Sequence, residues 1–169
     1  MRRNQLWDGW YFSGDAPREE NGTIAVSSNR QGLAYWSYLN PLNDLPVEVS
    51  ADLVFTGKSG IGLFCRDTQH GRYEFLIQPD GTWFIRRNRN SWYGTDSAYM
   101  TILAHGTSSA IQPGSNHIIA TCQGEELVFS LNGQELGRAQ DNYYAEGQVG
   151  IFFDVFAGGS FTNFTILAK

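Results

Sequence analysis

Short runs of alternating hydrophobic and polar residues follow one another along most of this chain, and no helical pattern interrupts them between Gly60 and Arg138. Val47–Phe55 is the clearest run, because its odd-numbered positions are all apolar and its even-numbered positions are mostly polar. Alternate side chains of a strand point to opposite faces, so this run predicts a strand with one face on a core. Other runs predict strands at Thr23–Ser27, Leu33–Leu39, Gly60–Arg66, Tyr73–Gln78, Trp83–Arg86, His117–Cys122, Leu127–Leu131, Gln134–Arg138, Gln148–Phe153 and Phe161–Ala168.

Two-residue turns separate several of these runs. Asp80-Gly81, Gly124-Glu125 and Asn132-Gly133 suit tight turns that need a positive φ. Polar or irregular segments predict loops at Ser13–Gly22 and between Asn88 and Gln112.

About a dozen strands predict an all-β fold, a two-sheet antiparallel β-sandwich of the jelly-roll kind, as one domain over residues 1–169. The aromatic segment Leu6–Phe12 is expected to lie near a sheet edge. The last strand is expected to pair with an N-terminal strand and close a sheet.

Composition narrows the classes of partner. The net charge of −5 argues against a general nucleic-acid binder, since neutralising phosphates needs a basic surface. No apolar run is long enough to span a membrane, and no membrane contact by this domain is expected. Met1–Trp7 does not have the pattern of a signal peptide. We therefore expect a cytoplasmic protein, or an extracellular or cell-envelope domain cut from a longer chain.

Two cysteines, Cys65 and Cys122, lie inside strand patterns with apolar neighbours. This setting favours two buried free thiols acting as small hydrophobes. A disulfide between neighbouring strands is the alternative, because spacing alone does not determine the geometry. Neither cysteine belongs to a CxxC pair, so a thiolate metal site is not expected.

Two blocks of sequence carry a resemblance to a known superfamily. The first contains Gly60-x-Gly-x-Phe-x-Arg66, Tyr73-x-Phe-x-Ile77 and Asp80-Gly-Thr-Trp83. The second contains Ser109-Ala-Ile-x-Pro-Gly-x-Asn116, Leu127-x-Phe-x-Leu-Asn-Gly133 and Gly147-x-Val-Gly-Ile-Phe152. Together they resemble the concanavalin A-like lectin/glucanase superfamily, and within it the bacterial laminin-G-like and 3-keto-disaccharide hydrolase-like domains. The resemblance implies the sandwich fold and, for many members, an accessory role beside other domains.

The sequence leans against catalysis. A β-glucanase of this superfamily would be expected to carry a Glu-x-Asp-x-Glu strand, which is missing. Glu48 and Asp52 lie four residues apart on one strand, roughly 13 Å between Cα atoms. Retaining hydrolysis needs carboxyl groups about 5 Å apart and inverting hydrolysis at most about 9.5 Å, so a structural role is the simpler interpretation of this pair. Glu74 and Glu48 remain weak catalytic candidates.

A sugar-binding face is the leading interpretation. Alternation puts Glu74 on the face opposite to Tyr73 and Phe75, where Arg66 and Arg86 on adjacent strands could reach it; a cross-strand ion pair is the simpler interpretation. Exposed aromatic side chains in loops are good contacts for sugar rings. The predicted ligand-binding residues are Arg66, Glu74, Trp83, Arg86, Trp92, Tyr93 and Tyr144, with the pair Tyr143-Tyr144 as a second loop candidate.

No metal site is predicted, although Asp67, Asp80, Asp96, Asp141 and Asp154 leave a structural calcium ion open. No cofactor is predicted. The leading hypothesis is a non-catalytic carbohydrate- or ligand-binding accessory domain. The alternatives are a glycoside-processing hydrolase of the 3-keto-disaccharide kind and a protein-interaction domain of a multidomain protein.

Overall fold

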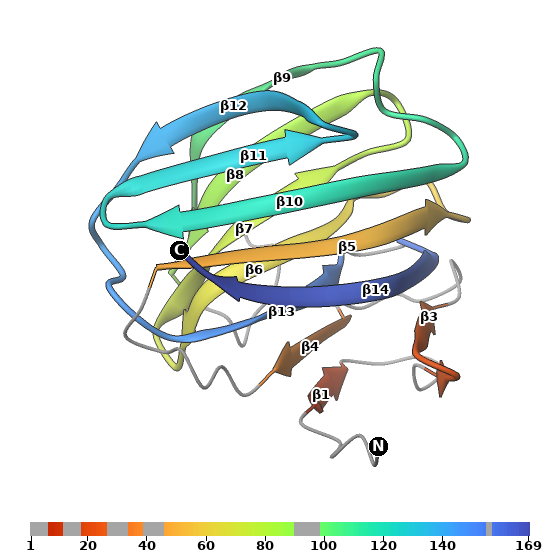
Figure 1. Cartoon of the computed structure of the whole chain (residues 1–169), viewed down its shortest axis with the longest axis horizontal. Coiled ribbons are helices and arrows are strands. Elements are labelled where there is room, and N and C mark those ends of the chain that lie inside the picture. Colours follow the sequence, from red (N-terminus) through yellow and green to blue (C-terminus); the bar gives the residue numbers. More distant parts are fainter. Residues whose placement is uncertain (1–6, 12–17, 27–33, 39–45, 90–98, 155–156) are drawn as a thin grey trace.

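The protein is a sandwich of two antiparallel sheets (Figure 1). The structure is a computed structural model that describes residues 7–11, 18–26, 34–38, 46–89, 99–154 and 157–169. Sheet A contains, in spatial order, β1 (Trp7–Tyr11), β4 (Ala34–Tyr38), β13 (Gln148–Phe153), β6 (Ile61–Thr68), β7 (Gly71–Ile77), β8 (Thr82–Asn88) and β9 (Met100–Thr107). Sheet B contains β12 (Gln134–Gln140), β11 (Glu126–Leu131), β10 (Ser115–Gln123), β5 (Val47–Phe55), β14 (Gly159–Ala168), β3 (Thr23–Val26) and β2 (Arg18–Glu20).

The observed strands confirm the predicted all-β sandwich. β5 and β13 have the predicted bounds, and β14 pairs with β3 and so joins the end of the chain to its N-terminal part. β1 lies at the edge of sheet A, as expected for the aromatic segment. Two predictions of loops are wrong, because each of these segments contains a strand. β2 lies within residues 13–22, and β9 lies between Asn88 and Gln112.

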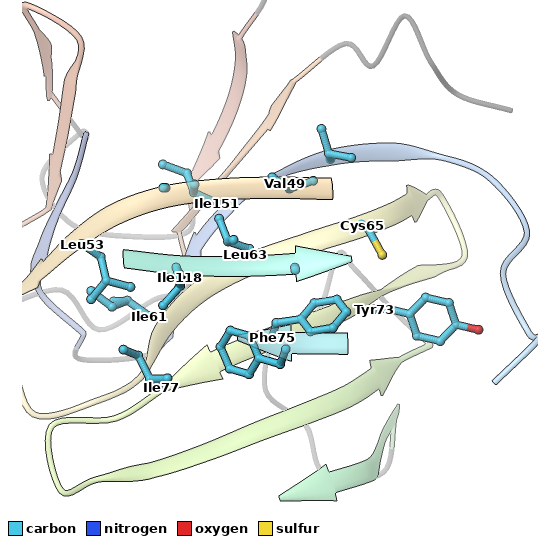
Figure 2. Packing of buried hydrophobic residues seen from close by; sticks show 14 of the residues in the cluster. Val49, Leu53, Ile61, Leu63, Cys65, Tyr73, Phe75, Ile77, Ile118 and Ile151 are labelled. Carbon is cyan, nitrogen blue, oxygen red and sulfur yellow. The ribbon is translucent and has the colours of Figure 1, made fainter. Parts of the chain in front are cut away.

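The main core lies between the two sheets and follows from the alternation (Figure 2). On β5, Val49, Ala51 and Leu53 are fully buried, and Ser50 and Asp52 between them are only partly buried. Tyr73, Phe75 and Ile77 on β7 point into the same layer, where Phe75 packs edge-on against Phe129 with ring centroids 5.7 Å apart. Buried aromatic and aliphatic side chains of this kind supply most of the free energy that stabilises a sandwich.

Backbone conformation at the turns agrees with the turn chemistry of the sequence. Gly81 and Gly124 adopt φ values of 89° and 56°, and Asn132-Gly133 adopts 49° and 82°. Two successive positive φ values match the right-handed twist of the flanking strands β11 and β12.

A disulfide joins Cys65 of β6 to Cys122 of β10, with the two Cα atoms 6.8 Å apart. The favoured prediction of two free thiols is therefore wrong, and the alternative of a disulfide is the one observed, although its two strands are not neighbours in one sheet. β6 belongs to sheet A and β10 to sheet B, so the bond crosses the core between the sheets. Alternation points both cysteines inward, and the sequence contains no separate signal for which facing strands meet.

The described residues form no helix that is long and apolar enough to cross a membrane.

Candidate functional site

A charged cluster lies on the face of sheet A that points away from sheet B, called the outer face below. Its centre is Glu74 on β7, which points outward because Tyr73 and Phe75 on either side point into the core. The Glu74 carboxylate is only 1% exposed. Arg72 Nε donates to Glu74 Oε1 at 2.8 Å, and Arg86 Nε donates to Glu74 Oε2 at 2.5 Å. Each carboxylate oxygen therefore has a charged donor, which fixes its direction.

Two further polar side chains extend this cluster. Asn88 Nδ2 lies 3.4 Å from Glu74 Oε1, and Arg86 Nη2 lies 3.4 Å from Asp154 Oδ2. Register explains the grouping, since Glu74 pairs with Arg86 and Arg72 pairs with Asn88 across β7 and β8. Arg72, Glu74, Arg86, Asn88 and Asp154 are called the Glu74 cluster from here on.

Apolar side chains surround the Glu74 cluster on the same face. Phe64, Leu76 and Phe152 are fully buried and form a second hydrophobic cluster, separate from the main core. The Arg72 guanidinium carbon lies 4.6 Å from the centroid of the Phe64 ring. The Arg86 guanidinium carbon lies 5.6 Å from the centroid of Phe152. Guanidinium groups held over aromatic faces gain cation–π energy, which offsets part of the cost of burying their charge.

The surroundings of Glu74 and Asp67 shift the pKa values of these two carboxyl groups in opposite directions. Burial by itself would raise the pKa of Glu74, but the positive charges of Arg86 and Arg72 outweigh it and lower the pKa to about 2. Burial raises the pKa of Asp67 to about 6, with Glu74 adding to the rise and Arg72 opposing it. Glu74 is thus a permanent acceptor, while Asp67 titrates near neutral pH.

Arg66 does not face Glu74, so that part of the predicted site is wrong. Arg66 has a φ of 53° at a register shift between Cys65 and Thr68 of β6. Its Nη1 donates to the Tyr144 carbonyl at 3.0 Å, and its guanidinium carbon lies 6.0 Å from the centroid of Tyr73. A bulge of this kind reverses the alternation that strict pairing predicts. Arg72, two residues before Glu74, supplies the charge that Arg66 was expected to supply.

Trp83 is also misplaced in the predicted site. It pairs with Ile77, is 7% exposed and belongs to the main core between the sheets. A side chain at Gly137 would start 2.3 Å from the Trp83 ring, and one at Gly106 would start 3.0 Å from it. The two glycines therefore leave the space that the indole fills, and Trp83 is a packing residue.

The loop candidates have different outcomes. Tyr144 is 6% exposed, and its hydroxyl lies within hydrogen-bond distance of the His70 and Asn88 carbonyls, so the structure places it among buried residues and its ligand contact stays a prediction. Its neighbour Tyr143 is 57% exposed. Trp92 and Tyr93 lie outside the described residues, and so does Asp96.

Glu48 lies on sheet B, and Glu74 lies on the outer face of sheet A, so they share no site. Lys169 Nζ lies 2.5 Å from Glu48 Oε2. Asp52, on the same strand as Glu48, instead accepts from Asn163 at 2.7 Å and contacts His117 Nδ1 at 2.6 Å. The structural interpretation of Glu48 and Asp52 fits these separate partners.

Sequence reasoning missed Arg72 and Phe152 on the outer face, and it considered Asp67 only as a possible calcium ligand. Alternation alone would have found Arg72, because it is two residues from Glu74 on one strand. Asp67 follows the bulge and Phe152 comes from a distant strand, so neither had a local signal. In the part of the chain that the structure describes, no group of three or more His, Cys, Asp or Glu residues could hold a metal ion.

Comparisons with known proteins show the fold. No protein-family model matches the chain, and no curated protein matches it by sequence. Among solved structures, the carbohydrate-binding module CBM66 from Bacillus subtilis is similar with a TM-score of 0.75 and 13% identity, covering 99% of both chains. A Bacillus subtilis protein of unknown function with a galectin-like fold has a TM-score of 0.71 and 11% identity, covering 96% of this chain and 89% of that one.

A third similar structure is the exoplasmic/lumenal domain of VIP36 bound to Ca²⁺ and Man3GlcNAc. It has a TM-score of 0.68 and 11% identity, covering 97% of this chain and 84% of that one. The chain thus has the concanavalin A-like, galectin-like sandwich fold that the resemblance implied.

Proposed function

We propose that this domain is a non-catalytic carbohydrate-binding domain whose ligand contacts the outer face of sheet A. The observation that carries the proposal is the Glu74 cluster: a carboxylate with 1% exposure orients Arg86, and Arg86 and Asp154 are the members whose side chains reach solvent. Ligand sites typically contain a few convergent, oriented polar groups.

Within the cluster, Arg86 and Asp154 are the members suited to touch a ligand. Their side chains are 10% and 15% exposed, whereas Glu74 and Arg72 are 1% and 0% exposed. A guanidinium donates and a carboxylate accepts, so together they match the donor and acceptor of two sugar hydroxyls. Glu74 and Arg72 act as positioning residues that hold Arg86 in place.

The shared fold supports the same proposal by analogy. One similar structure is a carbohydrate-binding module, and another was solved with a bound mannose-containing saccharide. Sites vary independently of the scaffold, so the analogy supports a ligand class and not particular residues.

The charges of the cluster do not favour the hydrolase alternative. A general acid needs a raised pKa, and the arginines lower the pKa of Glu74 to about 2. Glu48 lies on the other sheet and cannot act on the same bond. The Cys65–Cys122 disulfide supports an extracellular or cell-envelope location, since such bonds persist in oxidising compartments.

The test is binding to a glycan array, followed by calorimetry on the strongest ligand. Arg86→Lys and Asp154→Asn should each weaken binding by about tenfold, because the first loses the fixed guanidinium geometry and the second replaces a charged acceptor by a neutral amide. Arg138→Lys is the matched control, since Arg138 pairs with Glu126 and Glu135 on the exposed surface of sheet B. Circular dichroism should show that all three variants remain folded.

The proposal fails if the wild-type protein binds no glycan, or if Arg86→Lys and Asp154→Asn bind as the wild type does. Capture of a defined protein partner without glycan binding would favour the interaction-domain alternative. Turnover of a glycoside by the wild type would favour the hydrolase.

A further inference from the structure

Two exposed side chains of the edge strand β9, Ile102 and His105, lie on the outer face of sheet A (Figure 1 shows the strand). Ile102 is 56% exposed and pairs with Arg86, whose side chain points outward beside Glu74. His105 is also exposed and pairs with Phe84, which packs against the hydrophobic cluster of the outer face. Phe84, Ile102 and His105 are called the His105 patch from here on.

A bulge in β9 brings both exposed side chains to the same face. Residues three positions apart on a regular strand point to opposite faces of the sheet. In β9, however, two consecutive residues of β8 pair with Ala104 and Ile102, so Leu103 is an extra residue. Leu103 and Ala104 both pack against the main core, which returns Ile102 and His105 to the outer face.

The His105 ring is supported by a second aromatic ring. Its centroid lies 6.2 Å from that of Phe84, and the two planes are 24° from parallel. Phe84 is only partly buried, and it packs against the fully buried cluster of Phe64, Leu76 and Phe152. An exposed imidazole ring thus lies on a half-buried phenyl ring, which rests in turn on a fixed apolar base.

The His105 patch is continuous with the side chains proposed to contact the ligand. Phe84 and Arg86 are two residues apart on β8 and point to the same face, so about 7 Å of strand separates them. The cluster that supports Phe84 includes Phe152, and the Arg86 guanidinium carbon lies 5.6 Å from the centroid of that ring. Asp154 Oδ2 lies 3.4 Å from Arg86 Nη2. One small ligand on this face can therefore touch the aromatic rings and both charged groups.

This combination of groups matches the two kinds of surface that a sugar ring presents. The C–H groups on one face of the ring are apolar, and the hydroxyls at its edge donate and accept hydrogen bonds. Aromatic rings offer an apolar face, while a guanidinium donates and a carboxylate accepts. Because Phe84 already restricts the His105 ring, less side-chain freedom is lost when a ligand stacks on that ring.

We propose that the His105 ring is a platform on which a sugar ring of the ligand stacks while Arg86 and Asp154 bind its hydroxyls. Ile102 borders the platform, and Phe84 is a positioning residue beneath it. The inference rests on the proposed function and narrows its ligand. The saccharide that binds must present a face of C–H groups next to two free hydroxyls.

The test is calorimetry with cellobiose, lactose, maltose, a mannobiose and the strongest neutral glycan found on the array. His105→Ala should weaken binding by about fivefold, because the stacking surface is lost. His105→Phe keeps a ring without its nitrogen atoms and should stay within about twofold of the wild type. His105→Asn keeps a hydrogen-bonding group without the ring and should weaken binding as much as His105→Ala does.

Nuclear magnetic resonance provides a readout that a merely structural role would not change. Saturation of the His105 ring protons should transfer to C–H protons of the bound sugar. His117→Ala is the matched control for affinity, because the His117 side chain is 46% exposed and lies on β10 of sheet B.

Three results would overturn the inference. If Arg86→Lys loses binding while His105→Ala binds every glycan as the wild type does, the platform is wrong and the proposed function stands. If His105→Asn binds as the wild type does and His105→Phe does not, His105 supplies a hydrogen bond and no stacking surface. If the wild type binds no glycan, the proposed function fails and the platform fails with it.

Discussion

Asp67, a partly buried residue of β6, differs from an ordinary surface carboxylate. Its Oδ1 atom is buried and has no hydrogen-bond partner, and its pKa is raised to about 6 by burial. A side chain at Gly147, which has a φ of 141°, would start 2.8 Å from the Asp67 amide nitrogen. Gly147 thus lets the chain just before β13 pack closely against the backbone of the bulge.

The raised pKa makes the free energy of unfolding depend on pH with a definite sign. The folded protein holds the Asp67 proton more tightly than the unfolded chain, so the native state loses stability as pH rises from about 4 through about 6. Asp67→Asn removes this loss. The free energy of unfolding of the variant minus that of the wild type should therefore be larger above pH 6 than at pH 4, by on the order of 2 kcal/mol.

Urea unfolding of both proteins across this pH range measures the effect. Glu74 also contributes stability that is complete above its ordinary pKa of 4.5 and is lost as pH falls from there toward 2, but both proteins contain Glu74, so this contribution cancels in the difference between them. A constant difference between variant and wild type across the range would contradict the prediction.

At the residue scale, the sequence predicted the site in part. Glu74 and Arg86 were expected on one face and are joined there, because β7 and β8 pair in regular register at this point. Arg66 and Trp83 were not predictable in the same way. A bulge that has no local sequence signal points Arg66 away from Glu74. Trp83 fits a space left by glycines on β9 and β12.

Among the elements, β9 shows what alternation misses. Its eight residues show no regular alternation of buried and exposed positions, because it lies at the edge of sheet A and its pairing with β8 shifts register between Ile85 and Arg86. In the central strand β5, burial alternates from Val47 to Leu53, and the bounds of the strand were predicted to the residue. Regular periodicity therefore marks strands in the middle of a sheet better than strands at its edge.

The disulfide between β6 and β10 leads to a prediction about the stability of the two sheets. It links residues separated by 57 positions, and cross-links of that span restrict the unfolded chain strongly. Replacing both cysteines by alanine should lower the free energy of unfolding by about 4 kcal/mol, as measured by urea unfolding.

Reductant provides the control for this prediction. It should shift the unfolding midpoint of the wild type toward that of the Cys65→Ala/Cys122→Ala variant and leave the variant unchanged. Equal midpoints for the oxidised wild type and the variant would show that the cross-link does not stabilise the fold.

At the scale of the whole molecule, the net negative charge favours a neutral saccharide over a polyanion as the ligand. The chain carries a charge of −5, and a neutral saccharide displaces no condensed counterions when it binds. Glycan affinity should therefore change by less than about twofold between about 50 and 500 mM NaCl. A steep fall with salt in the same calorimetric titrations would instead indicate an anionic ligand.

The order of strands in sheet B also bears on how the protein is made. β14, the last strand of the fold in the sequence, lies between β5 and β3, which precede it by a hundred residues or more. Until residues 159–168 leave the ribosome, β5 has no partner on that side and β3 pairs only with β2. A nascent chain that stalls earlier would expose an unpaired strand edge, so completion of sheet B depends on the end of the domain being synthesised.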